Sequence, residues 1–247
     1  MGQGTTILGK EFQINKKLFL RLGRFSNLPT VFSQVATITI IAADGIYLFP
    51  FLGVCLGFAA LYTSGMFLND GFDCEYDRRL QNFRPIPRGE IDTMEVFFWG
   101  IALMVLGLFF FTAGGAAPGI SPLASMIIAL LTAVTILFYS WHHKNNPYGP
   151  LIMGFCRGWV YLGTALAFSH FQLWMIPVFF AAVLYTLMLT QVAKSKWAND
   201  SIVGWLVAGI CFVDVAILIA CAKEAWIPLP IMMFIATRFF HRYIRGT

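Results

Sequence analysis

A succession of apolar stretches, each about as long as a bilayer is thick, most constrains what this chain can fold into. Eight are predicted as membrane-spanning helices, at about 27–43, 46–68, 94–113, 122–141, 149–168, 172–192, 201–221 and 226–240. About 20 apolar residues in helical conformation cross the hydrocarbon core. The hydrophobic fraction of 58% and the charged fraction of 12% exclude an ordinary soluble domain. Because the stretches lack the alternation of barrel strands, we expect an all-α transmembrane bundle.

The basic residues lie almost entirely in one set of connecting segments. With eight spans, the N-terminal leader (1–26), the loops after the second, fourth and sixth spans, and the C-terminal tail share one side of the membrane, and only Lys223 and Arg157 fall elsewhere. Since cytoplasmic loops carry the excess of Lys and Arg, both termini are predicted to be cytosolic. This bias, with attraction to anionic membrane lipids, accounts for the net charge of +5, so no nucleic-acid partner is expected. We expect one multi-pass, integral-membrane domain over 1–247.

Three aspartates with helical spacing follow the second apolar stretch. Asp70, Asp73 and Asp77 are predicted to share one helical face, whereas Glu75 points to the opposite side. Carboxylates this close raise one another's pKa and are costly beside lipid unless a cation joins them. Mg²⁺ prefers oxygen ligands and often bridges carboxylates to substrate phosphates. The spacing therefore predicts a Mg²⁺ site; a solvated acidic helix end is the alternative.

This cluster and its surroundings resemble a known family. Asn69-Asp70-x-x-Asp73-x-x-x-Asp77 followed by Arg84-Pro85-Ile86-Pro87-x-Gly89 resembles the first signature of the UbiA superfamily of intramembrane prenyltransferases. The segment Arg24–Thr30 is similar to the opening of that family, and Tyr139-Ser140 with Lys144 resembles its tyrosine–lysine segment. The resemblance implies a Mg²⁺-dependent enzyme that moves a prenyl group from an isoprenyl diphosphate to a small hydrophobic acceptor, aromatic or lipid.

The resemblance also implies roles for individual residues. The residues carried across are Asp70, Asp73 and Asp77 for Mg²⁺, Asn69 in support, Arg84 and Arg88 for the diphosphate, Lys144 for the leaving group, and Asn27 and Tyr139 for the reacting end. Ionisation of the allylic C–O bond would leave negative charge on the diphosphate, which metal and basic groups stabilise. Aromatic faces would stabilise the carbocation-like centre, and a dry site would prevent hydrolysis.

The chain departs from the family pattern after the sixth span. Members usually have nine spans and a second aspartate-rich motif in this loop, which here offers only Asp200 beside Lys194 and Lys196. We hypothesise that the two lysines bind diphosphate in place of a second metal; ordinary positive-inside lysines are the alternative. The short length and the segment Cys156–Gly163 resemble a compact branch encoded in bacterial ebo-type clusters.

Two other classes of function fit parts of this pattern. A non-catalytic UbiA-like carrier or assembly subunit, which binds a prenylated or phosphorylated lipid without turnover, would also explain the missing second motif. A phosphatidyltransferase uses an aspartate cluster at a membrane face as well, but the residue order expected for that class is absent from the sequence.

Ionisable residues inside and beside the spans complete the set of candidates. Arg157 lies about 12 Å into the fifth span at 1.5 Å per residue, on the face of Tyr161. We expect it to contact an acidic acceptor or the diphosphate, with a structural pair or a snorkelling side chain as the alternative. Asp214 lies too deep for the metal site, so we expect it to be hydrogen-bonded between helices or protonated, with a catalytic role as the alternative. His142 and His143 are expected at a solvated helix end.

Overall fold

The described part of the chain is almost entirely helical. The computed structural model describes residues 6–7, 10–11, 14–43, 47–80, 84–115, 122–144, 146–168, 171–195 and 199–244. An antiparallel pair of two-residue strands, β1 (Thr6–Ile7) and β2 (Lys10–Glu11), precedes the helices. The helices are α1 (Lys16–Leu22), α2 (Leu28–Ala43), α3 (Leu48–Phe72), α4 (Cys74–Leu80), α5 (Thr93–Gly115), α6 (Pro122–His142), α7 (Gly149–Ala167), α8 (Met175–Ala193), α9 (Asp200–Gly209), α10 (Cys211–Ala220) and α11 (Pro228–Tyr243), with 3₁₀ turns at Phe25–Asn27 and Glu224–Trp226.

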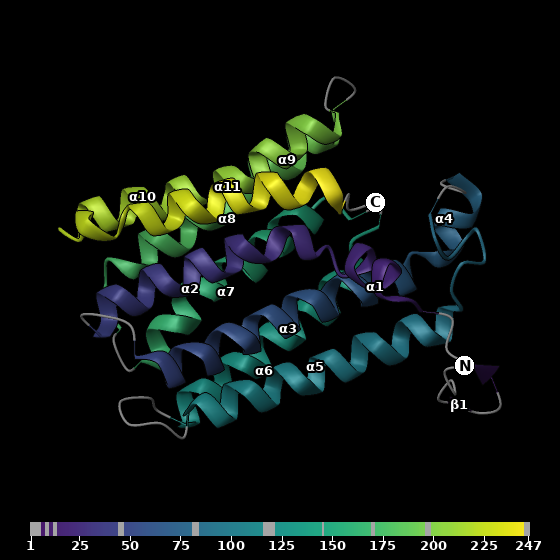
Figure 1. The fold of residues 1–247 in the computed structure, drawn as a ribbon, viewed down its shortest axis with the longest axis horizontal. Helices are drawn as coiled ribbons and strands as arrows, with labels where there is room; N and C mark the ends of the chain where they lie inside the picture. The colour runs from purple at the N-terminus through teal and green to yellow at the C-terminus, as the bar shows by residue number, and fades with distance from the viewer. Residues whose placement is uncertain are drawn as a thin grey trace.

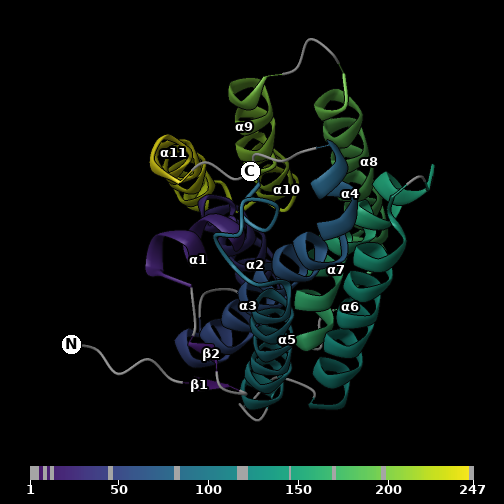
Figure 2. The same ribbon diagram turned by 90° about the vertical axis from the view of Figure 1, so that its right-hand side faces the viewer.

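The long helices run side by side along the longest axis of the molecule (Figure 1). Seen from the end, α9, α10 and α11 lie on one side of α2, whereas α3, α5 and α6 lie on the other (Figure 2). The short helices α1 and α4 lie at the same end of the bundle as β1 and the end of α11 (Figure 1). The predicted all-helical bundle is confirmed, and its described chain ends lie on the side of the aspartates; that this side is cytosolic stays a prediction.

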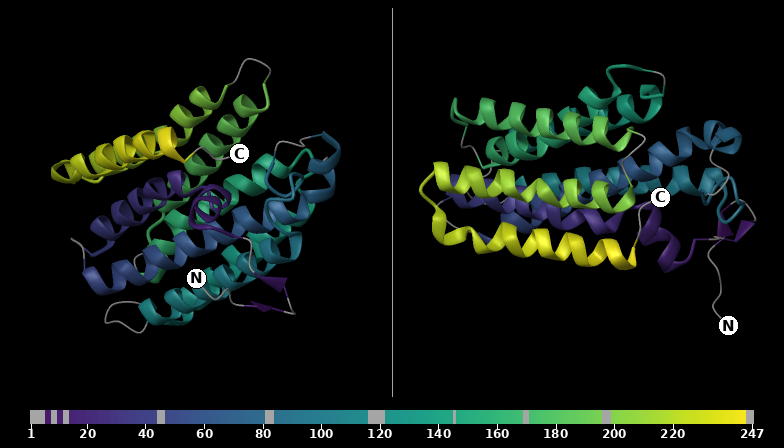
Figure 3. Two further views of the ribbon diagram at one scale, coloured as in Figure 1. Left: turned by 45° about the vertical axis from the view of Figure 1, so that its right-hand side comes forward. Right: turned by 90° about the horizontal axis from the view of Figure 1, so that it is seen from above.

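Six of the eight predicted spans correspond to helices that are long and apolar enough to cross a membrane. These are Phe25–Ala42, Leu48–Phe72, Thr93–Gly114, Pro122–His142, Met175–Ala193 and Asp200–Ala220. The last comprises α9 and α10, which follow one another in line with a break at Ile210 (Figure 3). The fifth and eighth predicted spans correspond to α7, which contains Arg157, and to the 16-residue α11. Apolar side chains such as Val105, Val134 and Leu184 are exposed on α5, α6 and α8, as expected for a surface that faces lipid.

Glycines allow α3 and α5 to pack at close range. A Cβ atom on Gly53 of α3 would lie 2.6 Å from the Cα atom of Gly114 on α5, so the two backbones touch at this crossing. Further along the same seam, Gly57 accommodates the ring of Phe111, and Gly107 accommodates Leu61. Small residues at helix crossings are the usual means of bringing backbones together in a membrane, where van der Waals packing replaces the hydrophobic effect between helices. This packing positions α3, which carries Asp70 and leads into Asp73 and α4.

Replacing Gly53 with alanine is expected to destabilise the fold. The added methyl group would meet backbone atoms of Gly114, which cannot move aside as a flexible side chain can. Overpacking of this kind costs about 1–3 kcal/mol, so Gly53→Ala should unfold at a lower temperature in detergent. Val105→Ala, which shortens a side chain that is 60% exposed on α5, is the control and should change the unfolding temperature little. Equal unfolding temperatures for the two variants would contradict this account of the seam.

Candidate active site

The three aspartates lie at the end of α3 and in α4. The main-chain N–H of Asp73 donates to the carbonyl of Asn69 (3.0 Å), and that of Asp77 donates to the carbonyl of Asp73 (2.9 Å). These helical hydrogen bonds continue past the end of α3, so the predicted common face is preserved. All three aspartates are buried, with exposures of 4, 3 and 2% along the chain, whereas Glu75 is exposed. The structure therefore gathers the acidic groups away from solvent.

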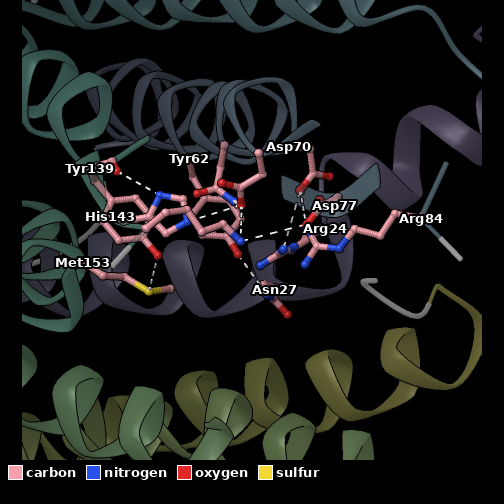
Figure 4. Close-up of polar contacts among 12 residues, drawn as sticks. Arg24, Asn27, Tyr62, Asp70, Asp77, Arg84, Tyr139, His143 and Met153 are labelled. Carbon is pink, nitrogen blue, oxygen red and sulfur yellow. Dashed lines mark hydrogen bonds and ion pairs between the residues drawn. The ribbon is translucent and has the colours of Figure 1, made fainter. Parts of the chain in front are cut away.

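Basic side chains from three separate segments surround these carboxylates. Arg84 approaches two of them, with Nη1 2.7 Å from Asp77 Oδ2 and 3.5 Å from Asp70 Oδ1. Lys144, which follows α6, places Nζ 3.1 Å from Asp73 Oδ2 and 3.9 Å from Asp77 Oδ1. Arg24 also turns toward this group, 3.9 Å from Asp70 (Figure 4). Arg84 and Lys144, which were predicted to contact the diphosphate, thus pair with the aspartates in this structure, together with Arg24 from the leader.

Arg24 reaches the cluster through an unusual backbone conformation. Its φ and ψ angles are 46° and 48°, in the left-handed region that residues with a Cβ rarely adopt. The residue precedes the 3₁₀ turn Phe25–Asn27, which leads into α2. A strained residue of this kind often marks a functional site, because the surrounding structure must hold it there. The sequence signal that could have identified Arg24 is its place at the start of the family-like segment.

His143 is a further partner of Asp73, and the expectation of a solvated helix end is wrong for this residue. Its side chain is 14% exposed, and Nε2 lies 3.3 Å from Asp73 Oδ2. Burial alone would raise the pKa of the Asp73 carboxyl, but the hydrogen bonds and positive charges of His143 and Lys144 outweigh it and lower that pKa. Asp73 is therefore ionised at neutral pH. His142, in contrast, is exposed.

The donor set fits a magnesium ion that is shared with a ligand. Among the residues that the structure describes, no three His, Cys, Asp or Glu side chains converge into a ready-made metal centre. However, Asn69 Oδ1 and Asp77 Oδ1 are buried oxygens that accept no hydrogen bond in this part of the chain. Mg²⁺ is usually held by one or two carboxylates together with water and substrate phosphate, not by a complete protein cage. An oxygen-only site of this kind is what the cluster offers.

A cavity of about 1000 Å³ extends from the cluster between α3, α7, α8, α9 and α11. The predicted site residues on its wall are Asn27, Asn69, Asp73, Arg84, Tyr139, Lys144, Arg157 and Asp200. Asp70 and Asp77 are not on the wall but pair with Arg84, which is. Most of the residues selected from the sequence are therefore brought together around one space.

Two predicted ligands of the diphosphate lie elsewhere. Arg88 is 54% exposed, and its Nη1 lies 3.7 Å from Glu90 Oε1, so the structure does not bring it to the cavity. Lys194 is exposed and is not among the residues that line the cavity. The other lysine of the hypothesised pair, Lys196, lies outside the described residues. The structure therefore offers no support for lysines of this loop as a replacement for a second metal.

A series of polar contacts along the cavity wall connects His241, Tyr62 and Arg157. His241 of α11 lies 2.8 Å from Asn27 Oδ1, and Asn27 Nδ2 donates to the hydroxyl of Tyr62 (2.8 Å). The guanidinium of Arg157 lies over the Tyr62 ring, 5.2 Å from its centre, and donates to Gln34 and Thr30 of α2. Within the described part of the chain, no carboxylate lies within ion-pair distance of Arg157. Sequence reasoning missed Tyr62 and His241, because neither belongs to a local motif.

A small apolar pocket of about 60 Å³ adjoins the large cavity. Tyr62, Tyr139, Met153 and Arg157 line both spaces. The remaining wall of the small pocket is formed mainly by aliphatic and aromatic side chains of α3, α6 and α7, including Phe58, Ile136 and Val160. A chamber that carries the charged residues therefore adjoins an apolar recess between helices.

Asp214 takes no part in this cavity and connects helices in the interior. Its carboxylate accepts hydrogen bonds from Ser33 of α2 and from the hydroxyl of Tyr161 on α7 (2.7 Å). Asp214 and Ser33 have no exposed surface, and Tyr161 is 1% exposed. The predicted hydrogen bond between helices is confirmed.

Removing the Asp214 carboxylate is expected to destabilise the bundle. In Asp214→Ala the buried hydroxyls of Ser33 and Tyr161 would lose their acceptor, at a cost of about 1–3 kcal/mol. Thermal unfolding in detergent measures this loss, and Glu224→Ala, at an exposed carboxylate in a 3₁₀ turn, is the control. An unfolding temperature unchanged by Asp214→Ala would show that the network does not stabilise the protein.

These features define a class of protein: an integral-membrane helical bundle with a charged chamber at one end and an apolar recess inside. The sequence profile of the UbiA prenyltransferase family matches residues 28–194, and the chain belongs to this family. Similar relatives are named protoheme IX farnesyltransferase of Protochlamydia amoebophila, 29% identical, and digeranylgeranylglyceryl phosphate synthase of Methanoregula boonei, 28% identical. The alignments cover 65 and 70% of this chain, but only 59% of each relative.

Solved structures support the same fold. One, of a digeranylgeranylglyceryl phosphate synthase in membranes, superposes with a TM-score of 0.59 at 20% identity and covers 92% of this chain and 95% of its own. A UbiA homologue from Archaeoglobus fulgidus, bound to DMAPP and Mg²⁺, gives a TM-score of 0.56 at 17% identity and covers 91 and 87%. At these identities the likeness concerns the fold alone.

Proposed function

We propose that the protein is a Mg²⁺-dependent intramembrane prenyltransferase that uses an isoprenyl diphosphate and a hydrophobic acceptor. The observation that carries this proposal is the buried cluster of Asp70, Asp73 and Asp77, held by Arg84, Lys144 and His143 beside a large cavity. Membership of the UbiA prenyltransferase family supports the reaction class.

The charges of the cluster suit a bound diphosphate. Asp73 and Asp77, supported by Asp70 and Asn69, would hold Mg²⁺, which when bound would neutralise phosphate oxygens and the charge that develops on the leaving group. The Nε atom of Arg84 is a buried donor that has no acceptor in the described part of the chain, so a phosphate oxygen would satisfy it. Lys144, at the cavity wall, would contribute positive charge to the departing diphosphate.

The transfer of the prenyl group would take place beside the rings of Tyr62 and Tyr139. Tyr62 and Tyr139 line both the large cavity and the apolar recess, so the reacting carbon of a substrate that occupied both spaces would lie near their rings. The faces of these rings would stabilise a carbocation-like centre, and the recess would receive the start of the isoprenoid tail. Arg157, which has no carboxylate of the described residues within ion-pair distance, would contact the diphosphate or an acidic acceptor.

A second function is favoured by one observation. Among the described residues, the wall formed by α8 and α9 offers Asp200 but no second group of aspartates, and Lys194 is exposed and does not line the cavity. A carrier or assembly subunit, which binds a prenylated or phosphorylated lipid without turning it over, would need only the first cluster.

Turnover distinguishes the two functions. Full-length protein in nanodiscs should release diphosphate from prenyl diphosphates of several chain lengths only when Mg²⁺ and a suitable acceptor from an aromatic and lipid panel are present. EDTA should abolish the release. Mg²⁺-dependent binding of the same compounds, with no product from any acceptor, would support the carrier instead and contradict the proposed enzyme.

A further inference from the structure

The wall of the cavity between α9 and α11 carries basic residues, two of them arginines, that the proposed reaction does not use. Arg238, His241 and Arg242 all line this wall, and their spacing of three and four residues puts them on one face of α11. Within the described residues, neither arginine lies within ion-pair distance of a carboxylate. In this respect they differ from Arg84 and Lys144, which pair with the aspartates.

Arg238 is held in place by contacts that leave its hydrogen-bond donors available. Its guanidinium lies over the ring of Trp205 on α9, 4.0 Å from the ring centre. It also packs against Gly204, where a Cβ atom would approach Arg238 Nη1 to 2.9 Å and His241 Nδ1 to 3.5 Å. A cation–π contact fixes the plane of a guanidinium but does not occupy its N–H groups. Arg238 is therefore positioned for an acceptor that the described residues do not supply.

The basic residues of α11 are connected to the diphosphate end of the cavity through His241. His241 contacts Asn27, which contacts Tyr62, and Tyr62 lies under Arg157. Only two carboxylates, Asp73 and Asp200, line the cavity as described. The cations on its wall are Arg24, Arg84, Lys144, Arg157, Arg238 and Arg242. Cations that face one space repel one another. The aspartates offset this repulsion at their own end of the cavity, and an anion beside α11 would offset it at the other end.

We propose that this wall binds an anionic group, a phosphate or carboxylate, that the acceptor carries. The inference rests on the proposed function and makes it more specific: the prenyl group would be transferred to an amphiphilic acceptor with an oxyanion at its polar end. Arg238 and Arg242 would bind the oxyanion, whereas the aspartates and Arg84 would hold the diphosphate. Guanidinium groups suit this task because they donate several hydrogen bonds in a fixed plane.

Inorganic phosphate is the probe that tests the wall. Full-length protein in phosphatidylcholine nanodiscs, saturated with Mg²⁺ and a non-hydrolysable prenyl thiodiphosphate, is titrated with phosphate at constant ionic strength. Trp205 beside Arg238 provides the fluorescence signal, which Trp205→Phe identifies. We expect a saturable change whose Kd rises at least tenfold in the Arg238→Gln/Arg242→Gln variant. Lys17→Gln, which removes an exposed charge on α1, should leave the Kd within twofold.

The remaining outcomes separate the alternatives. The double variant should still bind the thiodiphosphate with a Kd within twofold of the wild type, which would show that it is folded. If the double variant does not bind it, the single variant Arg242→Gln is used instead, because Arg242 is exposed and its substitution should not disturb the fold. Arg242→Gln must then raise the Kd for phosphate at least threefold. No saturable phosphate response, or an equal response in these variants, overturns the proposal. If phosphatidylglycerol nanodiscs abolish the wild-type response, a lipid head group occupies the wall and the acceptor assignment is wrong. Failure of the wild type to bind thiodiphosphate counts against the proposed function instead.

Discussion

Asp73→Asn is expected to lower the rate of Mg²⁺-dependent diphosphate release at least about 100-fold, as for the loss of one preorganised charged contact in an active site. Asparagine has nearly the same shape, so the variant removes the negative charge and little else. Asp73 is 3% exposed, contacts both Lys144 and His143, and lines the cavity. Its carboxylate is therefore the acidic group of the cluster with direct access to a ligand. Steady-state release of diphosphate at saturating Mg²⁺ measures the effect.

Glu75→Gln is the matched control for this variant. Glu75 lies two residues away in the same turn of chain, but its side chain is exposed. Its substitution should leave the rate within twofold, because the lost charge is exposed to solvent and does not line the cavity. An Asp73→Asn variant that turns over as fast as Glu75→Gln would contradict the role assigned to the cluster, provided that both variants unfold at the wild-type temperature.

Arg84→Gln is expected to destabilise the ligand-free protein by about 3–5 kcal/mol, the usual cost of leaving a buried charge without its partner. Arg84 approaches Asp70 and Asp77 together, and these carboxylates are 4 and 2% exposed. Without the guanidinium, both would remain buried with weaker compensation from Arg24 and Lys144. Chemical denaturation in detergent micelles, with Mg²⁺ removed by EDTA, measures the loss.

The double variant Asp77→Asn/Arg84→Gln identifies the cause. If the unpaired Asp77 charge is what destabilises Arg84→Gln, removing that charge should restore most of the stability, whereas activity should remain lost. The two substitutions would then be strongly non-additive, as expected for residues in direct contact. Losses of stability that simply add would show that Arg84 stabilises the fold by packing and not by neutralising the carboxylates.

Much of the fold follows from the apolar stretches, because a chain in lipid must satisfy its backbone hydrogen bonds within helices. What the stretches do not reveal is how a helix is interrupted inside lipid. The seventh predicted span is divided at Ile210, between α9 and α10, directly after Gly209. There the hydroxyl of Tyr185 on α8 donates to the carbonyl of Leu206 (2.7 Å), a contact that the apolar pattern of the span does not indicate. Nor does hydropathy reveal that α3 and α5 touch at Gly53 and Gly114, since that contact depends on tertiary packing.

The spacing of residues along a helix predicted the position of site residues better than the composition of the loops did. The spacing of Asp70, Asp73 and Asp77 is sufficient to predict their common face, because the helical hydrogen bonds continue through all three. Closeness in sequence to a site residue did not predict a place in the site. Arg88 and Lys194 lie close in sequence to site residues, yet their side chains are exposed and do not line the cavity.

Contacts between distant segments are what the sequence could not supply. His143 follows α6 and Arg24 precedes α2, yet both reach the aspartates at the end of α3. Which side of a connecting segment faces a cavity depends on how the helices before and after it are packed. No periodicity in this sequence encodes that choice.

Equilibrium binding of a non-hydrolysable prenyl thiodiphosphate tests most directly whether the aspartates bind a metal–diphosphate complex. Calorimetric titration of the full-length protein in phosphatidylcholine nanodiscs separates this step from turnover and from the choice of acceptor. We expect one binding event per chain, which requires Mg²⁺, disappears in EDTA, is lost in Asp73→Asn and is retained in Glu75→Gln. Binding of equal affinity in EDTA, or binding that Asp73→Asn leaves intact, would contradict this expectation.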